Sequence, residues 1–219
     1  MKWFVSDPHY GHVNLCSATS VWQDQDRCRK FKSLETMNDW IVNRINSVVK
    51  QDDELYCLGD WSFGGIENIW NFRNRIICRT VYEILGNHDD HIRNDRQLPN
   101  CKFDDCFPGE DSFFDNFNLN AQEIFTSVQS LLELVVDKQL IILFHHPIDH
   151  WRDAEKGSIM LHGHLHGKLN NCETNLKYRR KDVGIDCGGP FSLDEILEEM
   201  NKRETYKRSN DELISINQS

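Results

Sequence analysis

The amino-acid sequence predicts an α/β sandwich. Short apolar runs that are typical of strands alternate with amphipathic helical patterns along the 219 residues. Five of the apolar runs give way directly to turn residues that carry Asp, Asn or His side chains. Because the carboxyl ends of parallel strands meet at one edge of a sheet, we expect these polar side chains to lie together there.

The first half of the chain alternates strands with helices. A strand opens the chain and ends before Asp7. Residues 34–49 place apolar side chains at helical spacing, including Met37 and Ile41, which predicts an amphipathic helix. The elements predicted after this helix are a strand near 54–58, a helix over 66–76 and a strand over 81–85.

The middle of the chain contains a segment of different character. Residues 91–122 are rich in Asn, Asp, Phe and Pro and have neither a sustained helical nor a sustained strand periodicity. This pattern predicts a long, partly irregular insertion. No repeat, low-complexity tract or linker interrupts the chain elsewhere. We therefore predict a single domain over residues 1–219, with an insertion at 91–122.

The second half predicts further strands and a last helix. Two runs that flank Asp137-Lys138 have the pattern of a hairpin. Ser192 and Glu195 form a Ser-x-x-Glu capping box, which opens the last helix. The predicted elements are hairpin strands over 128–136 and 139–144, short strands at 158–161 and 182–185, and a helix from Ser192 to about Lys207, with a polar tail after Arg208.

Composition and charge limit the classes of function. The net charge of −10 argues against broad binding to nucleic-acid backbones, because phosphate repulsion would dominate. A nucleotide substrate is compatible with this net charge, since bound divalent ions can reverse the local electrostatic field at a site. No apolar run has membrane-spanning length, and the first apolar residues are too few for a signal peptide. The eight cysteines include no Cys-x-x-Cys pair, so we expect reduced thiols in a cytoplasmic protein.

Five motifs supply a candidate set of metal ligands. Carboxylate, amide and imidazole donors without thiolate favour Mn, with Fe, Zn, Ni or Co as alternatives. The carboxylate of Asp60 has two oxygens and could bridge two cations, and such a pair can activate a water for an in-line displacement. The motifs are Asp-x-His, Gly-Asp, Gly-Asn-His-Asp, a His after an apolar strand and Gly-His-x-His, and the candidate ligands are Asp7, His9, Asp60, Asn87, His145, His164 and His166.

The five motifs, in this order, resemble those of the calcineurin-like metallophosphoesterase superfamily. The first motif is similar to that of a small phage and bacterial branch, which reads Asp-x-His-Phe-Gly-His-x-Asn; here it is Asp7-Pro8-His9-Tyr10-Gly11-His12-Val13-Asn14. The resemblance continues through the later motifs as far as Pro190-Phe191-Ser192-Leu193, and only the stretch 91–122 falls outside it. It implies a four-layer α/β/β/α sandwich.

The resemblance also implies a role for each motif residue. Two divalent ions share Asp60, and a hydroxide between them attacks phosphorus in line. His88 acts as the general acid that protonates the leaving oxygen, and Asp89 orients His88. The implied ligands of the first ion are Asp7, His9, Asp60 and His166, and those of the second are Asp60, Asn87, His145 and His164.

Two departures from the wider superfamily bear on the substrate. The second motif there often ends in Asp or Asn, but Gly59-Asp60-Trp61-Ser62-Phe63 ends in Phe. The motifs of protein Ser/Thr phosphatases, with Arg before Gly86 and Glu after His88, are absent. We therefore expect a phosphodiesterase that acts on a nucleotide or another small phosphodiester. The alternatives are a DNA or RNA nuclease and a non-catalytic scaffold on the same fold.

Several other residues have more than one interpretation. His146 could replace its neighbour His145 as a ligand by a one-residue shift. His12 and Asn14 are candidate substrate contacts or packing residues under the first loop. Arg93 and Arg96 are candidate phosphate ligands or solvated charges of the insertion. The basic run at 177–181 could attract nucleic acid or form an exposed strand approach, and the phenylalanines of the insertion could stack on a base or pack as a small core.

Overall fold

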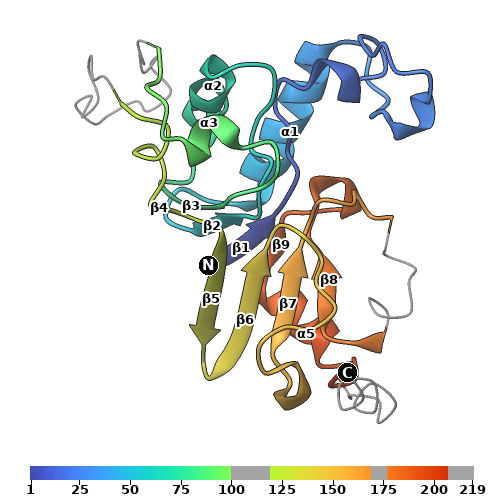
Figure 1. The fold of residues 1–219 in the computed structure, drawn as a ribbon, viewed down its shortest axis with the longest axis vertical. Helices are drawn as coiled ribbons and strands as arrows, with labels where there is room; N and C mark the ends of the chain where they lie inside the picture. The colour runs from blue at the N-terminus through green and yellow to red at the C-terminus, as the bar shows by residue number, and fades with distance from the viewer. Residues whose placement is uncertain (100–118, 169–176, 207–219) are drawn as a thin grey trace, which may run out of the picture.

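The framework of the protein is two β-sheets. The computed structural model describes residues 1–99, 119–168 and 177–206. The strands are β1 (Lys2–Val5), β2 (Glu54–Cys57), β3 (Thr80–Ile84), β4 (Ser127–Gln129), β5 (Leu131–Val136), β6 (Gln139–Phe144), β7 (Ile159–His162), β8 (Arg180–Asp182) and β9 (Phe191–Ser192). The first sheet has the order β4-β3-β2-β1-β9, and the second β5-β6-β7-β8 (Figure 1). Within them only β9 and β5 pair antiparallel to their neighbours.

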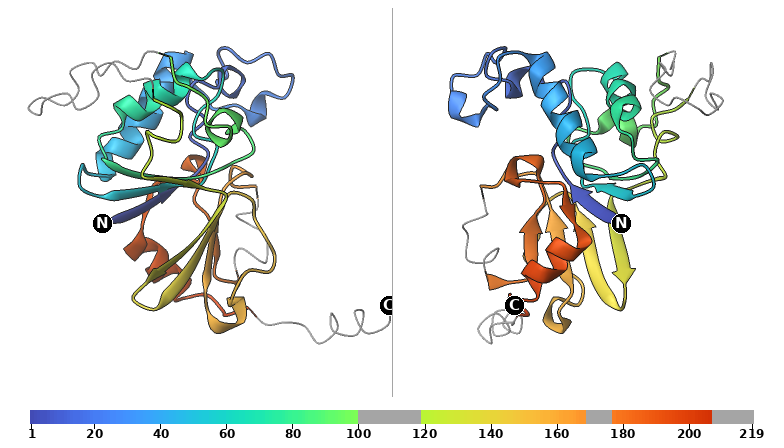
Figure 2. Two further views of the ribbon diagram at one scale, coloured as in Figure 1. Left: turned by 60° about the vertical axis from the view of Figure 1, so that its left-hand side comes forward. Right: turned by 180° about the vertical axis from the view of Figure 1, so that it is seen from behind.

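Three helices cover the outer face of the first sheet, and the last helix of the chain packs against the core between the sheets. The helices are α1 (Leu34–Val48), α2 (Glu67–Arg75), α3 (Asp90–Arg93) and α5 (Leu193–Met200). The Ser33 side chain caps α1 by accepting from the Thr36 amide, in a capping box. The apolar face of α1 packs with α2 against side chains of β1, β2 and β3 (Figure 2). Ile41 and Ile45 are fully buried there, and burial of each contributes about 1.5–3 kcal/mol.

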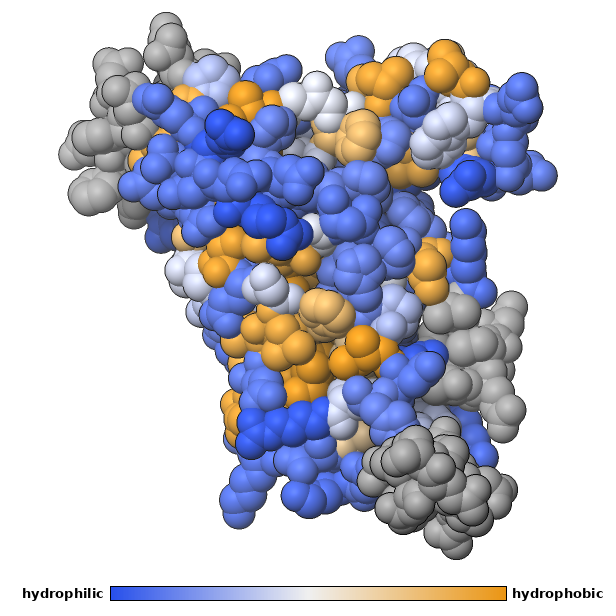
Figure 3. Space-filling view, viewed as in Figure 1, coloured by the Kyte–Doolittle hydropathy of each residue, from blue (hydrophilic) through white to orange (hydrophobic). Residues whose placement is uncertain are grey.

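The two sheets pack face to face. Alternate residues of β6 point to opposite sides, so Ile141 and Leu143 enter the core between the sheets while Ile142 lies on the outer face. Ile196 and Met200 of α5 join the core between the sheets. The outer face is covered by the segment around the 3-10 turn Ala154–Lys156, and hydrophobic residues gather over the second sheet in Figure 3. The predicted α/β sandwich is confirmed.

The predicted hairpin is present but begins later than expected. β5 and β6 pair antiparallel up to Val136 and Gln139. Asp137 and Lys138 between them have positive φ angles of 47° and 69°, as a two-residue type I′ turn requires. Residues 127–129 instead form β4, which pairs with β3 in the other sheet. The prediction of one strand over 128–136 was wrong because a bend at Ser130 divides this apolar run between two sheets.

Two elements near the carboxyl end also differ from their predictions. The sequence predicted a strand over 182–185, but the observed strand β8 already ends at Asp182. The residues after it leave the second sheet, because Val183 and Ile185 form backbone hydrogen bonds with Ser6 at the end of β1. The helix predicted to reach Lys207 ends at Met200. Its chain then turns to the second sheet, where the Glu204 amide donates to the carbonyl of Lys177.

The predicted insertion is described only at its two ends. Residues 100–118, which include the phenylalanines of the insertion, lie outside the described part of the chain. The end next to Asp89 begins with the four-residue helix α3. Leu98 and Arg96 pair with Leu119 and Ala121, which joins the two ends. Among the described residues, no helix is long and apolar enough to cross a bilayer, and all five cysteines are free thiols.

Candidate metal centre

The seven candidate ligands lie in five loops at the carboxyl ends of β1, β2, β3, β6 and β7. Backbone hydrogen bonds fasten these loops to one another. The Asp7 amide donates to the Gly59 carbonyl, and the His9 amide donates to the carbonyl of Asp60. In the second sheet, the Gly163 amide donates to the carbonyl of His145. The predicted gathering of motif residues at the strand ends is thus observed in both sheets.

Five of the seven candidate ligands have left-handed backbone conformations. Among the described non-glycine residues only nine have positive φ. Such conformations cost about 1–3 kcal/mol each and cluster at functional sites. They bend the chain after each strand, so that alternate residues can face one centre, as expected for Asp7 and His9. The angles are 55° for Asp7, 51° for His9, 59° for Asp60, 72° for His164 and 48° for His166.

One group of donors surrounds Asp7. The Nε2 atoms of His9 and His166 lie 3.8 and 3.9 Å from Oδ1 of Asp7. The two imidazole rings stack with their centroids 5.1 Å apart. Potential ligand atoms of these three residues lie within 4.8 Å of one another. Asp7 is fully buried, so its carboxylate requires a positive partner in this group.

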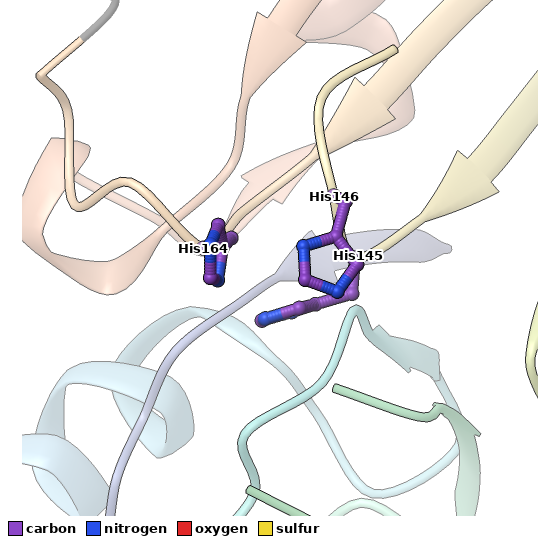
Figure 4. Close-up of side chains that lie close together, drawn as sticks. All are labelled: His145, His146 and His164. Carbon is purple, nitrogen blue, oxygen red and sulfur yellow. The ribbon is translucent and has the colours of Figure 1, made fainter. Parts of the chain in front are cut away.

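A second group of donors surrounds His145. The imidazole donates from Nδ1 to the carbonyl of Leu58 at 2.7 Å. Its Nε2 atom lies 3.0 Å from Oδ1 of Asn87 and 3.5 Å from Oδ2 of Asp60. Figure 4 shows His145, His146 and His164 directed into one space, and their potential ligand atoms lie within 4.8 Å of one another.

Asp60 links the two groups. Its Oδ2 atom is 3.5 Å from Nε2 of His9 and 3.5 Å from Nε2 of His145. Its Oδ1 atom accepts from the backbone amide of His88 at 2.8 Å. The carboxylate is 2 % exposed, and the arrangement has the form expected of a bridging ligand.

The donor set fits divalent metal ions. Because a carbonyl can only accept, Nδ1 of His145 carries a proton, and Nε2 is directed at the oxygens of Asn87 and Asp60. A divalent ion among these three atoms would satisfy all of them when Nε2 carries no proton. Burial raises the pKa of Asp7 to about 6, and burial lowers the pKa values of His9 and His164, which favours the neutral imidazoles that bind metals.

His166 is held by two residues that the sequence analysis did not assign. Its Nδ1 atom lies 2.7 Å from Oδ2 of Asp186. Arg29 donates to both oxygens of Asp186, at 2.7 and 2.8 Å, and to the backbone carbonyls of Asp7 and Pro8. Despite burial, His166 and Arg29 keep the pKa of Asp186 well below its usual range. The motif Val183-Gly184-Ile185-Asp186 was a signal for Asp186, but no pattern in the sequence marks Arg29.

Asp89 contacts the loops of other motif residues. Its Oδ2 atom accepts from the amides of Asp60 and Gly86, both at 2.7 Å, and its Oδ1 atom accepts from the amide of Trp61 at 3.0 Å. Both oxygens are thus engaged by backbone amides and not by the ring of His88, which Asp89 was expected to orient. The carboxylate fixes the Asp60 loop against the loop that carries Asn87 and His88.

Glycines in two motifs permit close approach of a ligand side chain. A Cβ atom at Gly86 would collide with the carboxylate of Asp60, and one at Gly163 would collide with Ser6 and the carboxylate of Asp7. This explains why a glycine precedes Asn87 and His164 in the two motifs.

The candidate substrate residues occupy different environments. His12 is buried beside His9, with ring centroids 5.4 Å apart, and stacks on Phe63. Asn14 accepts from the amide of Val21 within its own loop. Arg93 donates to the carbonyl of Gly86 at 2.8 Å, close to Asn87, and Arg96 is exposed on the described end of the insertion. The structure thus brings His12 and Arg93 to the motif loops.

Comparisons with known proteins show which family the chain resembles. The Gene 66 proteins of Mycobacterium phages L5 and D29 are 27% and 26% identical to this chain over 215 residues, which cover 91% of the chain and 93% and 95% of the phage proteins. A crystal structure of a protein of unknown function from Aquifex aeolicus has a TM-score of 0.60 and 18% identity, covering 90% of this chain and 98% of that one. A family model described as calcineurin-like phosphoesterase matches residues 3–168. The chain therefore belongs to the calcineurin-like phosphoesterase family.

Proposed function

We propose that this protein is a dinuclear metal-dependent phosphodiesterase that cleaves a nucleotide or another small phosphodiester. The observation that carries the proposal is the position of Asp60, 3.5 Å from both His9 Nε2 and His145 Nε2. Two groups of donors therefore share one carboxylate. Bound divalent ions, with Mn²⁺ favoured, would activate water and neutralise the phosphoryl oxygens.

The chain's own residues supply the remaining chemistry. Asp7, His9 and His166 would hold the first ion with Asp60, and Asn87, His145 and His164 the second. The backbone amide of His88 is bound to Asp60, and the exposed imidazole lies next to the ring of His9, with centroids 5.6 Å apart. These contacts support His88 as the general acid that would give a proton to the leaving oxygen.

The surroundings of the site support a small substrate over a nucleic-acid polymer. Part of the basic run at 177–181 is already neutralised. Arg180 forms an ion pair with Asp149 at 2.9 Å, and Lys181 forms one with Glu199 at 2.7 Å. With a net charge of −10, the described surface offers little attraction to a polyphosphate backbone.

A panel of substrates tests the proposal. The metal-stripped protein would be reconstituted with Mn²⁺, Fe²⁺, Zn²⁺, Ni²⁺ or Co²⁺ and assayed with bis-p-nitrophenyl phosphate, p-nitrophenyl phosphate and a phosphopeptide. We expect metal-dependent hydrolysis of the diester at the highest kcat/KM. Substitution His9→Ala should abolish hydrolysis of the diester. The control is His150→Ala, which should not abolish it, because the ring of His150 contacts Tyr206. Preference for the phosphopeptide, or no bound metal and no hydrolysis, would contradict the proposal, and the latter result would favour a scaffold.

A further inference from the structure

A cavity of about 310 Å³ opens next to His88. Asn87 and His88 form part of its wall, so the cavity is continuous with the candidate metal centre. Its lining also includes the buried residues Ile69 and Ile92 and the ring of Phe63. Binding pockets for small molecules enclose roughly 300–1000 Å³. The cavity is therefore large enough for one small organic group and too small for an extended polymer.

Phe63 gives this cavity an aromatic wall. One face of its ring stacks on His12, with centroids 4.0 Å apart and planes inclined by 14°. The ring meets His88 edge to face at a centroid distance of 5.2 Å. Two neighbouring rings thus hold Phe63 in place while it lines the cavity. A fixed aromatic ring in a partly apolar pocket favours a flat, uncharged group such as a nucleobase.

The charges around the cavity disfavour a second phosphate. Among the described residues that line it, none is Lys or Arg, whereas Asp89 and Asp90 are both present. The side chain of Asp90 is 80 % exposed. Arg93 lies 3.9 Å from the Asp90 carboxylate but does not line the cavity, so an additional phosphate would meet the carboxylates of the wall without a described Lys or Arg there.

We propose that this cavity is the leaving-group subsite and binds an uncharged nucleoside, with its base next to Phe63. The inference rests on the proposed function, because a general acid must lie beside the oxygen that it protonates, and His88 lines the cavity. In the step, the oxygen of a water that has lost a proton to solvent bonds to phosphorus, the bond from phosphorus to the nucleoside oxygen breaks, and that oxygen takes a proton from His88. The phosphoryl group stays as a monoester on the other substituent.

A substrate with two different ester groups tests which one enters the cavity. Adenosine 5′-(methyl phosphate) yields adenosine and methyl phosphate if the nucleoside leaves, but AMP and methanol if the methyl group leaves. With the Mn²⁺-loaded protein, we expect adenosine to exceed AMP by about tenfold, in line with the strength of base stacking on one aromatic ring. A 3′-phosphate on the same substrate should reduce the ratio of nucleoside release to methanol release.

Variants of Phe63 complete the test. Phe63→Ala and Phe63→Leu should both move the product ratio toward AMP, and this ratio does not depend on how much of the protein is folded. Phe31 is a half-buried aromatic residue that does not line this cavity. The control variant Phe31→Ala should therefore leave the product ratio unchanged. AMP as the main product, or a ratio insensitive to Phe63, would overturn the subsite while leaving the phosphodiesterase intact. Absence of any cleavage with Mn²⁺ would instead contradict the proposed function.

Discussion

His166 lies between two carboxylates, with Nδ1 2.7 Å from Oδ2 of Asp186 and Nε2 3.9 Å from Oδ1 of Asp7. Asp186 accepts the Nδ1 proton, so the Nε2 lone pair faces Asp7 and the candidate metal centre. Arg29 fixes the Asp186 carboxylate with two hydrogen bonds. Three residues from distant parts of the sequence thus determine the direction of one candidate ligand.

Substitution Asp186→Asn should weaken metal binding without removing a ligand. Loss of such an outer partner typically reduces metal affinity roughly 10–100-fold, because the imidazole loses its fixed tautomer and some basicity. Isothermal titration of the metal-free protein with Mn²⁺ would measure the change. Asp149→Asn, at an 86 % exposed side chain, is the matched control. Equal affinities for the two variants would show that Asp186 does not position His166.

His145 and His146 should differ in their effect on metal binding. His145 contacts Asp60 and Asn87, whereas the ring of His146 contacts the rings of Phe144, His145 and His164, the last at a centroid distance of 4.4 Å. We expect His145→Ala to lose one of two bound Mn²⁺ ions and His146→Ala to keep both. Metal analysis after dialysis would measure the stoichiometry. The reverse result would assign the second ion to His146, which is the one-residue shift left open by the sequence.

Metal affinity should rise with pH through the range in which Asp7 loses its proton. Burial raises the pKa of Asp7 to about 6, so a cation must displace a proton from this carboxyl at lower pH. Burial lowers the pKa of His166, but its hydrogen bond to Asp186 and the charges of Asp7 and Asp186 more than offset this and raise it overall. A proton on His166 therefore also competes with the metal.

Calorimetry in two buffers of different ionisation enthalpy would count the protons released when Mn²⁺ binds. We expect Mn²⁺ binding to release protons, and the affinity for Mn²⁺ to increase from about pH 5 to about pH 8, since metal ligands must be deprotonated. The variant Asp7→Asn should bind more weakly and lose the acidic part of this dependence. An affinity that stays constant across the same range would contradict the assignment of Asp7 as a ligand.

The effect of His88→Ala should depend on the leaving group. General-acid catalysis contributes typically about 10²–10⁴-fold, and an alkoxide needs the proton far more than p-nitrophenolate does. We expect a large loss of kcat/KM for adenosine 5′-(methyl phosphate) and a much smaller loss for bis-p-nitrophenyl phosphate. Equal losses for both substrates would indicate that His88 binds or positions the substrate instead of protonating the leaving oxygen.

Much of the candidate site could be predicted because each motif residue directly follows a strand. The apolar runs before Asp7, Asp60 and His145 determine where their loops begin. Because the strands are parallel, these loops meet at one edge of each sheet. The sequence could not show that Asp7, His9 and Asp60 adopt left-handed conformations, since Asp and His adopt them more often than most residues but still at only a few positions.

The features that the sequence could not show are contacts between distant residues. Arg29 and Asp186 are separated by 157 positions, and no local pattern relates them. Asp89 was expected to act on its neighbour His88, but its oxygens reach the amides of Asp60 and Trp61 in another loop. The bend at Ser130 likewise depends on which sheet receives each half of an apolar run, and this choice is made by tertiary packing.

The role of Asp60 is the centre of the proposed mechanism, and Asp60→Ala tests it most directly. Bound manganese and hydrolysis of bis-p-nitrophenyl phosphate would be measured on the same samples, at stoichiometric and at excess Mn²⁺, with circular dichroism to verify folding. Because Asp60 lies at 3.5 Å from both His9 and His145, we predict that the folded variant loses both ions at stoichiometric Mn²⁺ and loses hydrolysis with them. A folded variant that retains two ions per chain and wild-type hydrolysis would contradict the shared carboxylate and the dinuclear mechanism built on it.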